Sequence, residues 1–135
     1  MWTRSLMISS AAVMLVLGVL MTFAPREVLI WTGSQAPFLL VLAVQALGAL
    51  YLGFAALNWM AKDNLIGGIY SRPVSMGNFV HFFVMGANLL RALPAGYHVA
   101  VLWVTAILYV VFAVCFGLVV FGRSLPKAAQ RSCGK

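Results

Sequence analysis

The sequence predicts an all-α integral membrane protein, a four-helix bundle that forms a single transmembrane domain over residues 1–135. The composition is 64% hydrophobic, and the mean hydropathy is +1.03. The apolar residues form runs of about 20, the length that a helix needs to cross about 30 Å of hydrocarbon. The two acidic residues, Glu27 and Asp63, both lie between these runs. Because the runs do not alternate polar and apolar residues as barrel strands do, helices are the expected spanning structure.

The first two predicted spans are separated by a clear break. The first covers about residues 6–24 and ends at Pro25, a residue that helix interiors disfavour. Pro25 would directly follow a cleavage site, and the apolar run is long for a signal peptide, so we expect this segment to be retained. The second span covers about residues 38–61 and follows the turn-forming residues 33–37.

The third and fourth predicted spans are close neighbours. The third covers about residues 74–93, with Pro73 suited to the first position of the helix. The fourth covers about residues 97–122, and a basic tail, residues 123–135, follows it. Only residues 94–96 separate these two spans, so we expect them to pack antiparallel.

The second loop has an unusual composition. Its residues 65–70 are too apolar for an ordinary solvated loop. We expect this segment to lie in the headgroup region of the membrane. The alternative is an interfacial hairpin that docks a partner or lines the mouth of a cavity.

The basic residues predict the orientation of the chain. The net charge is +7, but the basic residues lie singly at the ends of apolar runs, which favours contact with the lipid bilayer and not with nucleic acid. With four spans, the two termini and the second loop share one side, whose seven basic residues are Arg4, Lys62, Arg72, Arg123, Lys127, Arg131 and Lys135. The other side carries Arg26 and Arg91. The positive-inside rule therefore predicts that both termini are cytoplasmic.

Rows of small residues predict helix contacts, because they let helices approach closely in lipid. Ala49, Gly53 and Ala56 form such a row on the second span, and Ala113 and Gly117 form one on the fourth. We expect these rows to pack mainly within the chain, with contacts between copies as the alternative.

The third span carries a polar face. Asn78, His81, Met85 and Asn88 are spaced three, four and three residues apart and therefore share one side of a helix. Polar groups are costly in lipid, so this face should point into the bundle. The expected partners on the other spans are Gln45, Asn58 and Tyr109. The face is interpreted either as an interhelical hydrogen-bond network or as a ligand or proton site at His81 and Asn88 that Asn58, Gln45 and Tyr109 complete.

Several kinds of chemistry have little support in the sequence. Cys115 and Cys133 form no CxxC motif, and the two histidines, His81 and His98, lie on different predicted helices without a nearby carboxylate. We therefore predict no metal site, no cofactor and no catalytic residue. A carrier that works through an intramembrane carboxylate is also disfavoured, because both acids lie outside the spans.

Two stretches resemble a known group of proteins. They are FAPREVL at residues 23–29 and QALGALYLGFA at residues 45–55. Together they resemble small four-helix bacterial membrane proteins of the DoxX-like kind, over about the first half of the chain. The resemblance implies a four-helix membrane fold and, for some members, a part in membrane redox or thiol-stress assemblies. It carries no functional residue over to this chain.

These observations lead to one functional hypothesis and two alternatives. We expect a non-enzymatic accessory or interaction subunit of the bacterial inner (plasma) membrane, whose partner is a second copy or another membrane protein. The first alternative is a protein that binds a small lipophilic ligand, a lipid or a quinone, in connection with membrane redox chemistry. The second is a small channel or exporter built from several copies.

Overall fold

The computed structural model describes residues 2–63, 72–92 and 100–122, and the regular structure of these residues is entirely helical. The all-α class is therefore confirmed. The helices are α1 (Trp2–Phe23), α2 (Pro25–Trp31), α3 (Phe38–Ala61), α4 (Arg72–Ala92) and α5 (Ala100–Phe121). The predictions for the second loop, for the first residues of the last span and for the basic tail fall outside the described residues.

The short helix α2 was not predicted. The chain leaves α1 at Ala24 and begins α2 at Pro25, whose fixed φ and missing N–H suit the first position of a helix. The helix ends at Trp31, and Gly33, which follows the C-cap residue Thr32, has a φ of +74°. There the N–H of Ser34 donates to the carbonyl of Leu29 at 3.0 Å. This is the Schellman arrangement, in which the left-handed residue is most often glycine.

Three of the described helices, α1, α3 and α5, are long and apolar enough to cross a membrane. The predicted second span coincides with α3 at both ends, and α5 lies within the predicted fourth span. The third predicted span matches α4 closely, and α4 has 21 residues. However, α4 is less apolar than the other three, because Ser75, Asn78, His81 and Asn88 interrupt its hydrophobic residues. Its role as a fourth span stays a prediction.

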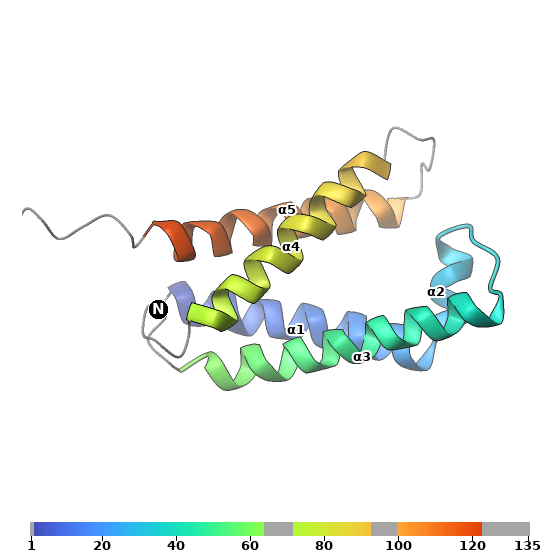
Figure 1. The fold of residues 1–135 in the computed structure, drawn as a ribbon, viewed down its shortest axis with the longest axis horizontal. Coiled ribbons are helices and arrows are strands. Elements are labelled where there is room, and N and C mark those ends of the chain that lie inside the picture. Colours follow the sequence, from blue (N-terminus) through green and yellow to red (C-terminus); the bar gives the residue numbers. More distant parts are fainter. Residues whose placement is uncertain (1, 64–71, 93–99, 123–135) are drawn as a thin grey trace, which may run out of the picture.

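The four long helices form two pairs (Figure 1). α1 packs along α3, and α4 packs along α5, whereas contacts between the pairs are few. α4 begins at the same end of the molecule as α1 and, in this view, slopes away from the α1–α3 pair toward its own C-terminal end. The two pairs therefore meet mainly through the N-terminal half of α4.

Glycines allow α1 and α3 to approach each other closely. A Cβ atom added to Gly48 would lie 2.5 Å from Thr22 Oγ1, and one added to Gly18 would lie 2.9 Å from the Leu52 side chain. Side chains at these two positions would force the helices apart. The predicted use of small residues at helix contacts in lipid therefore applies here, but on α3 the contact uses Gly48 and not the expected row.

The predicted row of Ala49, Gly53 and Ala56 does not form the contact between helices of the chain. All three residues are exposed, and a Cβ atom added to Gly53 would meet nothing within 4 Å. The row that faces α1 begins one residue earlier, at Gly48, and continues to Ala55, which is buried. Consecutive residues of a helix point about 100° apart. Both rows contain small residues, so the sequence alone did not show which of them faces α1.

The contact between α4 and α5 uses the row that the sequence indicated. Ala113 is buried, and a Cβ atom added to Gly117 would lie 3.2 Å from the Phe79 ring. Phe82 of α4 is fully buried and stacks on the ring of Phe112, with 4.8 Å between the centroids. Aromatic rings thus fill the space that the small residues leave.

The outward faces of the helices carry large apolar side chains. On α3 and α5 these include Leu50, Leu57, Met60, Val104, Ile107, Val111 and Leu118, each about half exposed or more. Monomers in water rarely expose apolar patches of this extent. These surfaces are those of a protein that lies in a membrane.

Candidate functional site

A pair of buried amides joins α3 to α4. Asn78 Nδ2 donates to Asn58 Oδ1 at 2.6 Å, and Asn58 Nδ2 donates to Asn78 Oδ1 at 2.8 Å. Asn58 Nδ2 also donates to Ser10 Oγ on α1 at 3.1 Å, and Asn78 Nδ2 donates to the carbonyl of Val74 at 2.8 Å. The side chains of Ser10, Asn58 and Asn78 are completely buried. Three helices therefore meet in one polar cluster, which we call the amide cluster (Ser10, Asn58 and Asn78).

The amide cluster satisfies its own hydrogen-bonding groups. Each amide has two N–H donors and one carbonyl oxygen. Every one of these groups has a partner inside the cluster or on the adjacent backbone. The Ser10 hydroxyl in turn donates to the carbonyl of Met7 at 3.0 Å. The cluster has no free group for a ligand, so its chemistry is that of a link between helices.

A second cluster lies about two turns nearer the start of α3. Tyr51 and Tyr109 are buried, and their hydroxyl groups are hydrogen-bonded to each other, which links α3 to α5. The His81 ring packs against four aromatic rings at centroid distances of 5.1 to 5.8 Å: Tyr51, Phe82, Phe54 and Tyr109. His81 Nε2 is buried and has no hydrogen-bond partner among the described residues. Thr22 Oγ1 is the other buried side-chain atom of the described residues that has no hydrogen-bond partner.

The remaining predicted site residues lie apart from His81. Gln45 is half-buried, and its Nε2 donates to the backbone carbonyl of Thr22 at 3.3 Å, so it joins α3 to α1 and not to α4. Asn88 is exposed, although it shares a helix face with Asn78 and His81. The slope of α4 explains this, because the far half of the helix has left the α1–α3 pair (Figure 1). The structure therefore pairs Asn58 with Asn78 and places Tyr109 against His81, and it separates Gln45 and Asn88 from both clusters.

Sequence reasoning missed Ser10 and Tyr51. Tyr51 lies seven residues before Asn58, a spacing that places both on one face of α3. Because Asn58 was expected to face the interior, this spacing could have predicted that Tyr51 is buried as well. Ser10 offered no such signal, because a lone serine in an apolar run usually bonds to its own backbone. Ser10 does so, and it accepts the Asn58 bond as well.

Charged groups gather where α1 begins and α3 ends. Arg4 Nε lies 3.2 Å from Asp63 Oδ1, and both side chains are 62% exposed. Lys62 Nζ lies 3.3 Å from the centre of the Trp59 ring, a cation–π contact. Two basic groups and one acid thus form this end of the α1–α3 pair.

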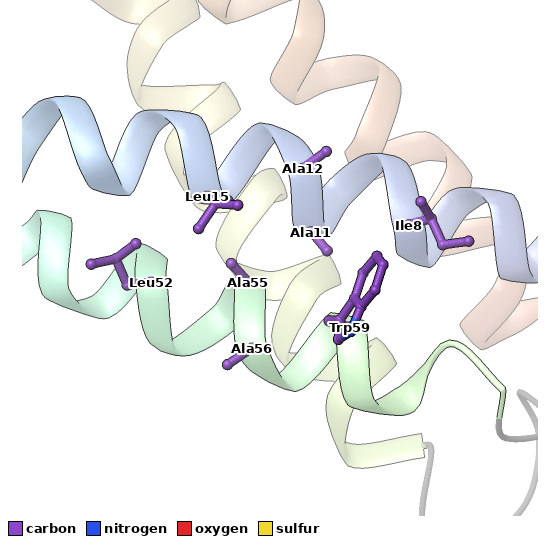
Figure 2. A pocket seen from close by; sticks show the side chains of 8 residues that line it. All are labelled: Ile8, Ala11, Ala12, Leu15, Leu52, Ala55, Ala56 and Trp59. Carbon is purple, nitrogen blue, oxygen red and sulfur yellow. The ribbon is translucent and has the colours of Figure 1, made fainter.

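Each helix pair has an apolar groove on its surface. The groove between α1 and α3 has a volume of about 430 Å³ and is lined by Ile8, Ala11, Ala12, Leu15, Leu52, Ala55, Ala56 and Trp59 (Figure 2). The groove between α4 and α5 has a volume of about 410 Å³, and Phe82, Phe83, Gly86 and Val114 are among its lining residues. Neither groove contains His81 or a member of the amide cluster.

The fold and these sites define a class: an all-helical membrane protein with three apolar helices long enough to cross a bilayer. Among the described residues, no group of three or more His, Cys, Asp or Glu side chains is arranged to hold a metal ion. No family model, curated protein or solved structure matches the chain.

Proposed function

We propose that this chain is a four-span, non-enzymatic component of the bacterial inner membrane that serves as an accessory or interaction subunit. The fourth span in this proposal is α4. Its 21 residues extend about 32 Å at 1.5 Å per residue, enough for the hydrocarbon core. It packs along α5, and its residues Ser75 and Asn78 are buried, so these polar groups are kept from lipid.

The arrangement of the helices supports cytoplasmic termini. The starts of α1 and α4 and the end of α3 lie at one end of the molecule (Figure 1). That end carries Arg4, Lys62 and Arg72, and the basic tail follows α5 in the sequence. Arg26 and Arg91 belong to the opposite end in this four-span arrangement. The excess of basic residues favours the cytoplasm for the first end.

The observation that carries the proposal is the division of polar groups between the interior and the surface. Asn58 and Asn78 are fully used in linking helices. By contrast, Asn88 is exposed and makes no side-chain hydrogen bond among the described residues, and Arg91 is exposed one turn beyond it. An exposed amide on a spanning helix is costly in lipid unless a polar partner meets it. This part of α4 therefore suits contact with another membrane protein or a second copy.

A photo-crosslinking experiment tests this contact. A photoreactive amino acid is placed at residue 88 and, as a matched control, at Val104, which is exposed on α5. We expect a discrete protein adduct from residue 88 and only lipid adducts from Val104, because no polar group at Val104 requires a partner. The adduct is identified by mass spectrometry, and Asn88→Leu should reduce recovery of the same protein. Equal adducts from both positions, or unchanged recovery with Asn88→Leu, would refute the proposal.

The binding of a small lipophilic ligand is a second candidate function, favoured by His81. An imidazole nitrogen buried without a partner requires an explanation, because buried polar groups in native structures are nearly always paired. The surrounding aromatic rings suit the flat headgroup of a quinone, whose carbonyl oxygen accepts a hydrogen bond. The test compares organic extracts of purified wild-type and His81→Gln protein by mass spectrometry. A compound that is present at equal amounts in both would rule out this site.

A further inference from the structure

The groove between α1 and α3 has a shape that suits one hydrocarbon chain. Its floor includes the buried residues Ala11 and Ala55, and larger side chains flank it, with Trp59 beside Ile8 at one end (Figure 2). The groove extends from Ile8 to Leu15, about 10 Å at 1.5 Å per residue. Its volume of about 430 Å³ lies in the range of small-molecule sites.

The groove has basic groups at one end. Arg4 precedes Ile8 by four residues on α1, and Lys62 follows Trp59 by three residues on α3, so each cation lies about one turn beyond the lining. Because Arg4 pairs with Asp63, the two cations are at the same end of the pair. With Asp63 counted, this end carries an excess of one positive charge. The cation–π contact engages one side of the Lys62 ammonium group, which has three N–H donors.

We propose that this groove binds an anionic phospholipid, with one acyl chain along the small residues and the headgroup phosphate beside Lys62 and Arg4. The depth of the groove agrees with the length of one lipid leaflet. Leu15, at its far end, lies about 16 Å from Arg4 along α1, close to half of a hydrocarbon core about 30 Å thick. The lipid therefore belongs to a single leaflet. In this arrangement Trp59 lies at the level between the acyl chain and the headgroup of the lipid, which is the level that tryptophan favours in membranes. This inference does not depend on the proposed function, since neither His81 nor Asn88 takes part.

The experiment measures lipid retention by the full-length protein in native mass spectrometry. The protein is incubated with phosphatidylglycerol or phosphatidylcholine that carry identical acyl chains, and bound lipid is counted after gentle release from detergent. We expect phosphatidylglycerol to be retained about fivefold more, as one basic side chain near a membrane surface contributes about that factor in affinity for anionic lipid. Equal retention of the two lipids would overturn the proposal.

Two variants separate the headgroup contact from the groove. Lys62→Gln should lower the preference for phosphatidylglycerol about fivefold, whereas Arg26→Gln, a matched charge change on α2, should leave it unchanged. Ala12→Phe should lower the retention of both lipids, because Ala12 is exposed and a larger side chain there fills the groove without entering the helix contact. Circular dichroism and size-exclusion chromatography confirm that each variant is folded.

Three further results of the retention measurements would overturn the proposal. The first is an unchanged preference in Lys62→Gln, or the same loss in Arg26→Gln. The second is unchanged retention in folded Ala12→Phe, which would place the lipid outside the groove. The third is displacement of the lipid by glycerol phosphate at equal concentration, which would show a site for free phosphate.

A fluorescence experiment tests the position of the acyl chain beside Trp59. In a variant with Trp59 as its single tryptophan, bromine atoms on the acyl chains of phosphatidylglycerol should quench the Trp59 fluorescence more than those of phosphatidylcholine. Equal quenching would contradict the proposal.

Discussion

Replacing Asn78 by Leu tests whether the amide cluster joins the two helix pairs. The change keeps a side chain of similar size but removes both reciprocal hydrogen bonds to Asn58, at 2.6 and 2.8 Å. Interhelical side-chain bonds in membranes contribute about 0.6 kcal/mol on average and about 1.7 kcal/mol at most, so two bonds contribute about 1 to 3 kcal/mol. The cost of leaving the buried Asn58 carbonyl without a donor, about 1 to 3 kcal/mol, is a second estimate of the same loss and is not added to it. We expect Asn78→Leu to lower the free energy of unfolding by about 1 to 3 kcal/mol.

A double-mutant cycle shows whether this loss belongs to the pair. Asn58→Leu should also destabilise the protein, and the double variant should be less destabilised than the sum of the two, by about 1 kcal/mol or more, because neither amide is then left unpaired. The free energy is measured by reversible unfolding of purified protein in mixed micelles, followed by circular dichroism. Asn88→Leu is the matched control, since Asn88 is exposed, and should change the stability by less than about 0.5 kcal/mol.

Additive losses in the double variant would refute this reasoning. They would mean that the two amides act independently and that the reciprocal bonds do not stabilise the contact between α3 and α4. A loss in Asn88→Leu as large as that in Asn78→Leu would refute it as well, because the effect would then follow from removing any amide from α4.

Three other predictions use different parts of the structure. Gly48→Leu should cost about 1 to 3 kcal/mol, because its side chain would strike Thr22, whereas Gly53→Leu should be tolerated in the same unfolding assay because nothing lies within 4 Å of that position. Equal effects of the two changes would show that α3 is rotated from its position in the structure. His81→Gln should leave the melting temperature within a few degrees of the wild type but remove any bound lipophilic compound, and a folded variant that keeps the compound would contradict the role of His81. Reporter proteins fused before residue 1 and after residue 135 should both report the cytoplasm, and a reporter outside would indicate an odd number of spans.

Hydropathy and spacing were sufficient for the class of the fold and for the link between α3 and α4. The apolar runs identified the long helices to within a few residues, because the need to pair backbone groups in lipid leaves little choice of structure. The spacing of Asn78 and His81 placed them on one face, and Asn58 was correctly expected to meet that face, where it bonds to Asn78.

The sequence was insufficient where two choices had similar energies. Gly48 and Gly53 both begin or continue rows of small residues, and which row faces α1 depends on a rotation of α3 that only the packed structure determines. Asn88 was expected inside because it shares a face with Asn78. A shared face guarantees a shared environment only if the neighbouring helices stay parallel, and α4 slopes away from α3 (Figure 1). The helix α2 was missed because Pro25 was interpreted only as an end of a helix and not also as a start.

The amide cluster also has a consequence for the order in which the chain is assembled. Asn58 donates to Ser10, which belongs to the helix pair that is synthesised first, and Asn78 donates to the carbonyl of Val74 in its own helix. Each amide therefore has one partner before α3 and α4 meet. In a newly inserted α1–α3 pair, the Asn58 amide is already bonded to Ser10 before α4 is present, so it is not fully unpaired in lipid. When α4 packs against α3, Asn58 and Asn78 form their two reciprocal hydrogen bonds. The two helix pairs are therefore joined through the amide groups that neither pair satisfies fully by itself.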